Sequence, residues 1–570
     1  MKRTMFRYLK KELIYIVLSI LMAFFSVILT LAVPIIMGKC IDLIAGRHDV
    51  NFDMLKVYAL WLVIIILVNS MITWIMNIIN NKITYTIMRD VRNDAFLKLT
   101  KLPLKYTDSH RTGEITSMII QDTENLGDGL LMGFTQAFTG IITIVGTLVY
   151  MFILNVKIAL AVMFITPLSL VVANFIAKKT YIFFRGQSLA RGEATAYIEE
   201  MLGNLKVVKA FTREDESIAK FDGLNENLKK NSFKAIFYSS LTNPSTRFVN
   251  SVVYAVVALM GCFMAMDDLI TVGAIATFLS YANQYTKPFN EISGVITELQ
   301  NAFACAKRVF ALIEEEPEVD REDTGFVPKE RRIEISHVDF AYTKEQKLIT
   351  DFNLSVEYGK KVAIVGPTGC GKTTLINLLM RFYDVRGGSI TIDGTDIRDI
   401  SRDELRSMFG MVLQDTWLRS GTIRDNIRFA REDATDEEIV AAAKLSRAHS
   451  FIKRLPQGYD TVITEEGEGL SQGQKQLLCI TRIMLLDPAF LILDEATSSI
   501  DTRTEIQIQN AFDTLTKGRT SFIVAHRLST IMNADIILVM KDGNVIEQGT
   551  HDELMKLGGF YSELHKSATA

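Results

Sequence analysis

The sequence predicts a polytopic α-helical membrane domain with six transmembrane helices, followed by an α/β P-loop NTPase domain. The first 313 residues hold six long apolar runs, and the last 240 hold a strand, a glycine-rich turn and a helix in succession. A chain of 570 residues is too long for one ordinary core, so several domains are expected. We place the transmembrane domain at 1–313, a linker at 314–330 and the P-loop domain at 331–570.

The six apolar runs lack Asp, Glu, Lys and Arg, and each is at least 18 residues long, enough to cross ~30 Å of hydrocarbon as a helix. They span 13–38, 57–81, 129–156, 158–177, 248–266 and 269–286. A signal peptide would have a shorter apolar core and a small-residue cleavage site, so we expect the first run to be retained. Buried helices of a soluble protein explain one such run but not six.

Charges between the runs predict the orientation of the helices. Lys and Arg number five before the first run, seven in 82–128 and twelve in 178–247, but only four in the remaining connections together. Because basic residues concentrate on the cytoplasmic side, we expect both termini and the P-loop domain in the cytoplasm. No organelle-targeting segment is seen, so the bacterial cell membrane is the expected location.

Two of the basic segments are expected to continue as helices beyond the bilayer and then to turn back. The turns are predicted near 106–113 (YTDSHRTG) and 203–211 (GNLKVVKAF). Net charge is only −3 with 22% charged residues, which argues against a nucleic-acid partner. The five cysteines form no CxxC pair, so neither a disulfide framework nor a zinc site is indicated.

The stretch KKVAIVGPTGCGKTTLINLLMRF predicts a phosphate-binding loop, because GPTGCGKT fits G-x-x-x-x-G-K-[ST] between an apolar strand and a helix. Glycines let backbone N–H groups approach phosphates closely. Lys372 is expected to reach the β- and γ-phosphates, and Thr373 to bind Mg²⁺.

Other strand ends predict further parts of the same site. FLILDE places Asp494, suited to hold Mg²⁺, before Glu495, suited to act as general base. His526 and Gln414 also follow predicted strands, where they would reach the γ-phosphate and Mg²⁺ with its attacking water. Tyr342 precedes the loop and is expected to stack on adenine, although an ordinary strand aromatic would look the same.

Taken together, these motifs resemble a known family. The order Tyr342, GPTGCGKT, Gln414, LSQGQ, LILDE, SSID and His526 is similar to the nucleotide-binding domain of ATP-binding cassette (ABC) transporters. With six preceding spans, the whole chain resembles a half-transporter of the exporter type, similar to bacterial multidrug and lipid exporters. Small departures are Gln472, where Gly is common, and Lys475, where Arg is usual.

The resemblance implies why a second glycine-rich loop, EGEGLSQGQ, opens a helix far from the first. In that family two nucleotide-binding domains face each other head to tail, and each ATP lies between the P-loop of one and the signature loop of the other. Ser471, Gly473 and Gln474 would then contact ATP held by a partner chain, and Asp501 would lie near the same dimer interface.

The predicted site residues form three groups. The catalytic group is Glu495, His526 and Gln414. The group expected to bind ATP is Tyr342, Gly366, Pro367, Thr368, Gly369, Cys370, Gly371, Lys372, Thr373, Thr374, Ser471, Gly473, Gln474 and Asp501. The group expected to bind Mg²⁺ is Thr373, Gln414 and Asp494.

The expected function is ATP-driven export of hydrophobic or amphipathic compounds across the bilayer by a dimer of half-transporters, with a homodimer favoured because the site residues are intact. No charge lies inside the spans, so no ion route is marked. The residues considered for a substrate cavity are Trp61, Trp74, Phe134, Gln136, Tyr254, Phe278, Tyr281, Asn283 and Gln284.

Three alternatives stay open at this point. A few transporters with this exporter fold import siderophores, and the sequence does not separate the two directions. In a second alternative, the chain is one subunit of a heterodimer whose partner carries an altered site. A soluble ATPase regulator built on the same cassette is disfavoured by the six apolar runs.

Overall fold

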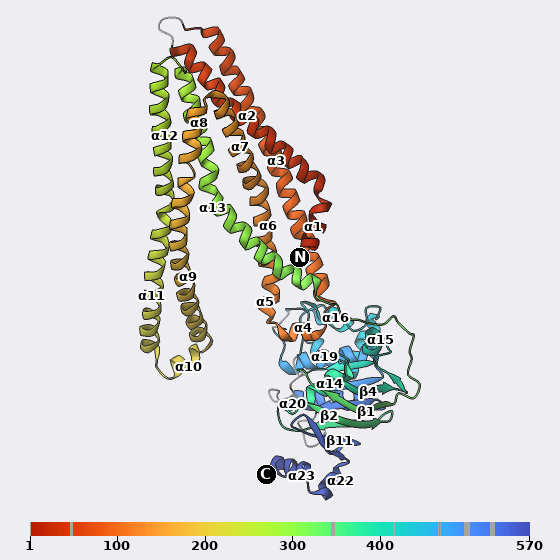
Figure 1. The fold of residues 1–570 in the computed structure, drawn as a ribbon. Coiled ribbons are helices and arrows are strands. Elements are labelled where there is room, and N and C mark those ends of the chain that lie inside the picture. Colours follow the sequence, from red (N-terminus) through yellow and green to blue (C-terminus); the bar gives the residue numbers. More distant parts are fainter. Residues whose placement is uncertain are drawn as a thin grey trace. The chain divides into compact units, whose positions relative to one another are not determined.

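The computed structural model describes residues 2–45, 50–343, 348–413, 416–464, 467, 469–494, 502–524 and 531–569. The chain forms two compact units (Figure 1). The helical unit comprises Met1–Leu102 and His110–Glu316, and the nucleotide-binding unit comprises Pro103–Ser109 and Pro317–Ala570. One short segment of the N-terminal half, Pro103–Ser109, is thus part of the C-terminal unit.

The helical unit consists of long helices joined by short turns. In chain order its helices are α1 (Lys2–Lys11), α2 (Leu13–Ala45), α3 (Phe52–Leu99), α5 (Thr112–Ser117), η1 (Met118–Asp122), α6 (Thr123–Met132), η2 (Gly133–Ala137), α7 (Phe138–Leu154), α8 (Val156–Ile165), α9 (Leu168–Gly203), α10 (Leu205–Ala210), α11 (Glu214–Ser240), α12 (Thr242–Met266) and α13 (Val272–Glu314). The turns at α4 (Leu104–Ser109) and α10 fall where the sequence predicts them.

Four helical stretches among the described residues are long and apolar enough to cross a membrane. They are Leu13–Ala45, Phe52–Leu99, Thr112–Leu154 and Glu214–Met266. The fourth predicted run, 158–177, is instead divided by a turn at Thr166–Pro167 into α8 and the start of α9. Proline explains the division because it has no N–H to donate to the preceding turn. The sixth run lies at the start of α13.

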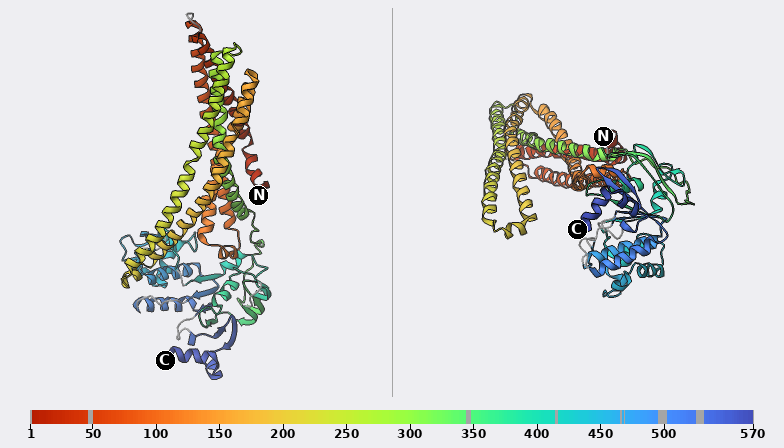
Figure 2. Two further views of the ribbon diagram at one scale, coloured as in Figure 1. Left: turned by 60° about the vertical axis from the view of Figure 1, so that its left-hand side comes forward. Right: turned by 90° about the horizontal axis from the view of Figure 1, so that it is seen from below.

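Close crossings hold the helical unit together. Helices α2 and α3 lie side by side, as do α9 and α11 (Figures 1 and 2). Where α2 meets α13, a Cβ on Gly273 would stand 1.9 Å from the Gly38 carbonyl oxygen, so only glycine permits this approach. Beside it, Thr277 donates to the Pro34 carbonyl (3.0 Å) and Tyr281 to that of Leu31 (2.6 Å).

An ion pair joins the π-helical turn η1 to α13. Asp122 is buried and accepts two hydrogen bonds from the Arg308 guanidinium, at 2.7 Å from Nε and 2.6 Å from Nη2. Such a bidentate arrangement fixes both position and orientation. Asp122 is the last residue of the π-helical turn η1, which aims it at α13.

The nucleotide-binding unit is built on a six-stranded sheet and a four-stranded antiparallel sheet. The six-stranded sheet has the order β12-β11-β3-β10-β9-β6, in which only the edge pair β11–β12 is antiparallel. Its strands are β3 (Lys361–Val365), β6 (Phe409–Val412), β9 (Phe490–Asp494), β10 (Thr520–Val524), β11 (Ile536–Lys541) and β12 (Asn544–Gly549). The other sheet, in the order β2-β1-β4-β5, contains β1 (Ile333–Phe340), β2 (Ile349–Val356), β4 (Gly387–Ile392) and β5 (Thr395–Asp396).

Helices and short elements complete this unit. A two-stranded sheet pairs β7 (Gly421–Thr422) with β8 (Val462–Ile463). The described helices are α4, α14 (Lys372–Leu379), α15 (Arg402–Ser407), α16 (Ile423–Arg428), α17 (Asp436–Leu445), α18 (His449–Ile452), η3 (Gly458–Asp460), α19 (Gln472–Leu486), α20 (Thr502–Thr516), α22 (His551–Leu557) and α23 (Phe560–Thr569).

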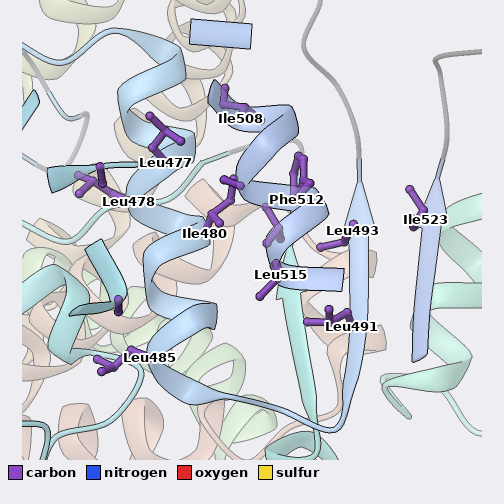
Figure 3. Packing of buried hydrophobic residues seen from close by; sticks show 14 of the residues in the cluster. Leu477, Leu478, Ile480, Leu485, Leu491, Leu493, Ile508, Phe512, Leu515 and Ile523 are labelled. Carbon is purple, nitrogen blue, oxygen red and sulfur yellow. The ribbon is translucent and has the colours of Figure 1, made fainter. Parts of the chain in front are cut away.

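Apolar packing on the parallel sheet positions α19. Figure 3 shows Leu477, Ile480 and Leu485 of α19 in one cluster with residues of α20, β9 and β10. Leu477 and Ile480 are fully buried. Because the strands are buried on both faces, they read as continuous apolar runs such as FLIL and SFIV.

The start of the linker docks on α15 through charge. The buried Arg402 side chain lies 3.1 Å from Glu318, 3.3 Å from Asp320 and 3.3 Å from Asp384. Glu404 accepts hydrogen bonds from the backbone N–H groups of Thr324 and Gly325, which lower its pKa to about 2. A depressed carboxyl pKa stabilises the docked linker above the ordinary value of 4.5, and this contribution is lost as pH falls toward 2.

Replacing Arg402 with Met keeps the apolar stem but removes the charge. Three partly exposed carboxylates would lose their cation, and we expect trypsin to cleave after Arg321 about tenfold faster, equivalent to about 1.4 kcal/mol of local stability. Arg454→Met, at an exposed position, is the matched control. Equal cleavage rates in the two variants would contradict this role for Arg402.

Candidate nucleotide site

The turn from β3 into α14 forms a phosphate-binding cradle. Strand β3 is buried between β11 and β10, and the turn leaves its carboxyl end at Gly366. A Cβ on Gly366 would stand 2.3 Å from the Met540 carbonyl oxygen and 2.7 Å from the Cys370 sulfur, so only glycine fits. Gly371, at φ 99°, is the N-cap of α14 and directs the unpaired N–H groups of that helix into the turn.

The Lys372 and Thr373 side chains both lie at the junction of the loop and α14. The Lys372 ammonium donates to the Gly366 carbonyl (2.8 Å) and the Pro367 carbonyl (3.0 Å), so it lies across the loop. Thr373 is exposed at the first turn of α14. Cationic and N–H donors therefore lie together at this loop, which suits a polyphosphate.

Tyr342 reaches this cradle from the four-stranded sheet. It follows β1, and its hydroxyl donates to Thr374 Oγ1 (3.2 Å) while accepting from Asn377 Nδ2 (3.2 Å). Both partners lie on α14, so the ring lies next to the helix that begins at the phosphate loop. The sequence alone left open an ordinary strand aromatic, and stacking of the ring on a base stays a prediction.

The parallel register brings several strand ends to the edge that carries the loop. Val524 of β10 pairs with Ile364 of β3 on one side and with Asp494 of β9 on the other. Val412 of β6 pairs with Leu493. Asp494 is thus on the same edge as Gly366, two strands away, where a carboxylate can serve a phosphate-bound cation.

Four of the predicted site residues, Glu495, His526, Gln414 and Asp501, lie outside the described residues. The described parts of their strands nevertheless end at the same edge, at Asp494, Val524 and Val412. Within the described part of the chain, no group of three or more His, Cys, Asp or Glu side chains could hold a metal ion.

A second helix N-terminus is exposed at α19. Ser471 is its N-cap: the Ser471 Oγ accepts from the Gln474 N–H (3.3 Å), and the Gln474 side chain accepts from the Ser471 N–H (3.0 Å). Ser471 and Gln472 are exposed and Gly473 is buried. A helix of 15 residues directs a positive dipole end at this point, and the Ser471 O–H remains able to donate.

Arg482 anchors α19, a role that sequence reasoning missed. Its guanidinium donates to the Asn426 carbonyl (2.6 Å), the Asn426 side chain (2.6 Å) and the Trp417 carbonyl (2.7 Å). The rings of Trp417 and Phe429 lie 5.7 Å and 5.6 Å from it. Arginine at this position in the TRIMLL stretch was the available signal, because a buried cation requires such partners.

The proposed substrate-cavity residues of the helical unit divide into three kinds. Phe278 and Tyr281 are fully buried in the helical core, where they pack against other apolar side chains. Trp61, Trp74 and Tyr254 are exposed. Gln136 lines an apolar cavity of about 160 Å³ between η2–α7 and α13.

Comparison with known proteins decides the family. Residues 16–289 match the ABC transporter transmembrane region and residues 349–498 match the ABC transporter family model. YfiC of Bacillus subtilis (strain 168), named an ABC transporter ATP-binding protein, is 40% identical over 568 residues, which cover 99% of this chain and 94% of that protein. The chain belongs to the ABC transporter family.

Further matches describe the kind of ABC transporter. The fatty acid ABC transporter ATP-binding/permease protein of Mycobacterium bovis is 41% identical over 490 residues, covering 86% of this chain and 78% of that protein. A solved structure of a bacterial Atm1-family ABC exporter with ATP bound has a TM-score of 0.78 and 28% identity, covering 99% of each chain. The chain is an ABC exporter, in which an ATP-binding domain follows the transmembrane domain and drives transport.

Substituting two glycines of the loop separates steric clash from backbone strain. Gly366→Ala and Gly369→Ala both place a side chain at positive φ, but only at position 366 would the Cβ meet other atoms. We expect Gly366→Ala to weaken ATP binding at least about tenfold beyond Gly369→Ala. Equal dissociation constants for a fluorescent ATP analogue would show that close approach at Gly366 is not required.

Proposed function

We propose that this ABC exporter moves hydrophobic or amphipathic compounds out of the cell as a homodimer, with two ATP molecules bound between the subunits. The observation that carries the proposal is the presence in one chain of two helix N-termini suited to a phosphate, those of α14 and α19. Within the described residues, no hydrogen bond joins Ser471 to the loop Gly366–Thr373. A head-to-tail dimer gives each α19 terminus a phosphate to bind.

In this proposal the residues of one subunit hold the nucleotide and those of the other complete the site. Tyr342 stacks on adenine, and the loop Gly366–Thr374 surrounds the phosphates with Lys372 beside the β- and γ-phosphates. Ser471, Gly473 and Gln474 of α19 contact the γ-phosphate held by the partner subunit, and Asp501 lies near the same interface. Clamping from both sides pulls the domains together, and phosphate release separates them.

Hydrolysis is assigned to residues at the carboxyl edge of the parallel sheet. Glu495 accepts a proton from the attacking water, and His526 and Gln414 orient the γ-phosphate and that water. Thr373, Asp494 and Gln414 would hold Mg²⁺, which supplies charge neutralisation between the β- and γ-phosphates. These three residues suit Mg²⁺, because Mg²⁺ at phosphate sites binds few protein oxygens and takes its other ligands from phosphate and water.

The substrate class follows from the apolar character of the helical unit. The six apolar runs contain no charged residue, and Gln136 is the one polar side chain among the described residues that line the 160 Å³ cavity. A relative named for fatty acid transport agrees with an amphipathic cargo. The charge distribution between the runs supports a cell-membrane location with the nucleotide-binding unit in the cytoplasm.

ATP hydrolysis by the purified chain alone tests the homodimer. We expect activity in the wild type, a loss of about 10²–10⁴-fold in Glu495→Gln because the general base is removed, and a loss of about 10–10²-fold in Ser471→Ala. Tyr358→Phe, before β3, is the unchanged control. A well-folded but inactive wild type would contradict the homodimer and indicate a second, different half-transporter.

Stimulation of that ATPase tests the substrate class. In lipid nanodiscs, long-chain fatty acids and amphipathic cations are expected to raise the rate several-fold, whereas sugars and inorganic ions are not. Direction is measured in inside-out vesicles, where export appears as ATP-dependent accumulation in the lumen. Stimulation by polar solutes alone would contradict the proposed class, and loss of cargo from the vesicles would contradict the direction.

A further inference from the structure

Tyr383 lies where the P-loop helix ends. Helix α14 begins at the phosphate loop and spans eight residues, about 12 Å. The chain then turns at Arg381, at φ 48°, and Tyr383 follows. Neither the sequence motifs nor the proposed chemistry assigns this tyrosine a role. Its ring is partly buried and contacts two separate structures, the Tyr342 side of the nucleotide site and helix α4.

On one side, Tyr383 packs edge-on against the ring expected to stack on adenine. The centroids of Tyr383 and Tyr342 are 5.0 Å apart and their planes meet at 88°. Phe340 closes this aromatic cluster at 5.0 Å from Tyr342 and 5.9 Å from Tyr383. Edge-to-face contacts depend on ring orientation. A base that fixes the Tyr342 ring therefore also constrains Tyr383.

On the other side, the Tyr383 hydroxyl donates to the Asp108 carboxylate of α4. Burial raises the pKa of this hydroxyl, and the neighbouring carboxylate raises it further, so it stays a donor at all physiological pH values. A groove of about 420 Å³ lies beside the contact, lined by Pro103, Lys105, Tyr342 and Tyr383 among others. The hydrogen bond thus joins the aromatic cluster to α4 next to this groove.

Hydrogen bonds and ion pairs also hold the segment Arg381–Asp384, which contains Tyr383. Buried Arg381 donates to the carbonyls of Ile397 (3.1 Å) and Ile400 (2.9 Å) and to Asp384 (2.9 Å). Asp384 also lies 3.3 Å from Arg402, which forms ion pairs with Glu318 and Asp320 of the linker. The segment Arg381–Asp384 is therefore attached both to α4 and to the linker, the two parts of this unit that continue into the helical unit.

We propose that Tyr383 is a positioning residue through which nucleotide bound beside Tyr342 restrains helix α4. The inference rests on the proposed stacking of adenine on Tyr342. Stacking holds the Tyr342 ring, the edge contact holds Tyr383, and the hydroxyl of Tyr383 holds Asp108. Helix α4 forms the turn between two long helices of the transmembrane domain. Bound nucleotide would therefore also limit the movement of those two helices at their shared turn.

The test compares hydrogen–deuterium exchange in the full chain in nanodiscs, with and without ATP and Mg²⁺. Glu495→Gln is the parent, so that nucleotide is not consumed. Tyr383→Phe keeps the ring and removes the hydroxyl. Tyr358→Phe is the matched control, since its hydroxyl also bonds a charged side chain, Arg331 (3.2 Å), at the opposite end of β3 from the phosphate loop. Exchange is followed in peptides covering 103–112 and 366–374.

In the parent and in Tyr358→Phe, ATP is expected to slow exchange in both peptides. In Tyr383→Phe, protection of 366–374 is expected to remain, whereas ATP-dependent slowing at 103–112, about tenfold in the parent, should disappear. Asp108→Ala should have the same effect, and the double variant should be no worse than either single variant. A purely structural role would instead alter both peptides with and without ATP.

Three results would overturn the inference. The first is that ATP protects 366–374 but not 103–112 in the parent. The second is that ATP protects 103–112 equally in Tyr383→Phe and Tyr358→Phe. Either result would contradict the inference and leave the proposed function intact. Absence of ATP protection at 366–374 in the parent would contradict the proposed function and the inference together.

Discussion

The turn from β3 into α14 brings backbone N–H groups to the carboxyl edge of the parallel sheet, and the nucleotide-binding unit is arranged around that turn. It requires glycine at position 366, where a Cβ would meet the Met540 carbonyl. Lys372 lies across the loop, Tyr342 reaches α14 from the second sheet, and Asp494 ends a strand two positions away in the sheet. The N-terminus of α19 at Ser471 likewise presents unpaired N–H groups and a positive dipole end. Among the described residues, no hydrogen bond joins Ser471 to the phosphate loop of its own chain.

Physical contacts link this site to the segments that continue into the helical unit. Tyr383 joins the aromatic cluster beside the P-loop helix to Asp108 of α4, and Arg402 joins the same segment to the linker. In the helical unit, Gly38 with Gly273 and Asp122 with Arg308 hold α13 against earlier helices. In the proposed mechanism, nucleotide-driven movement would therefore act on helices that are already joined to one another.

Local patterns predicted much of this, and long-range contacts were beyond them. The strand–glycine turn–helix around GPTGCGKT and the helical character of all six apolar runs follow from neighbouring residues. The turn at Thr166–Pro167 divides one predicted run. Proline cannot donate the backbone hydrogen bond that continues a helix, and a hydropathy pattern does not detect this. Tyr383 and Asp108 are 275 positions apart, so no spacing rule connects them. Glu495, His526, Gln414 and Asp501 remain predictions.

The central claim is that each ATP is bound by two copies of this chain. Cryo-electron microscopy of Glu495→Gln in nanodiscs with ATP and Mg²⁺ tests it directly. The account predicts a γ-phosphate within hydrogen-bonding distance, about 3 Å, of both Lys372 and the partner subunit's Ser471. Nucleotide bound by one chain alone, with Ser471 in solvent in a closed dimer, would contradict it.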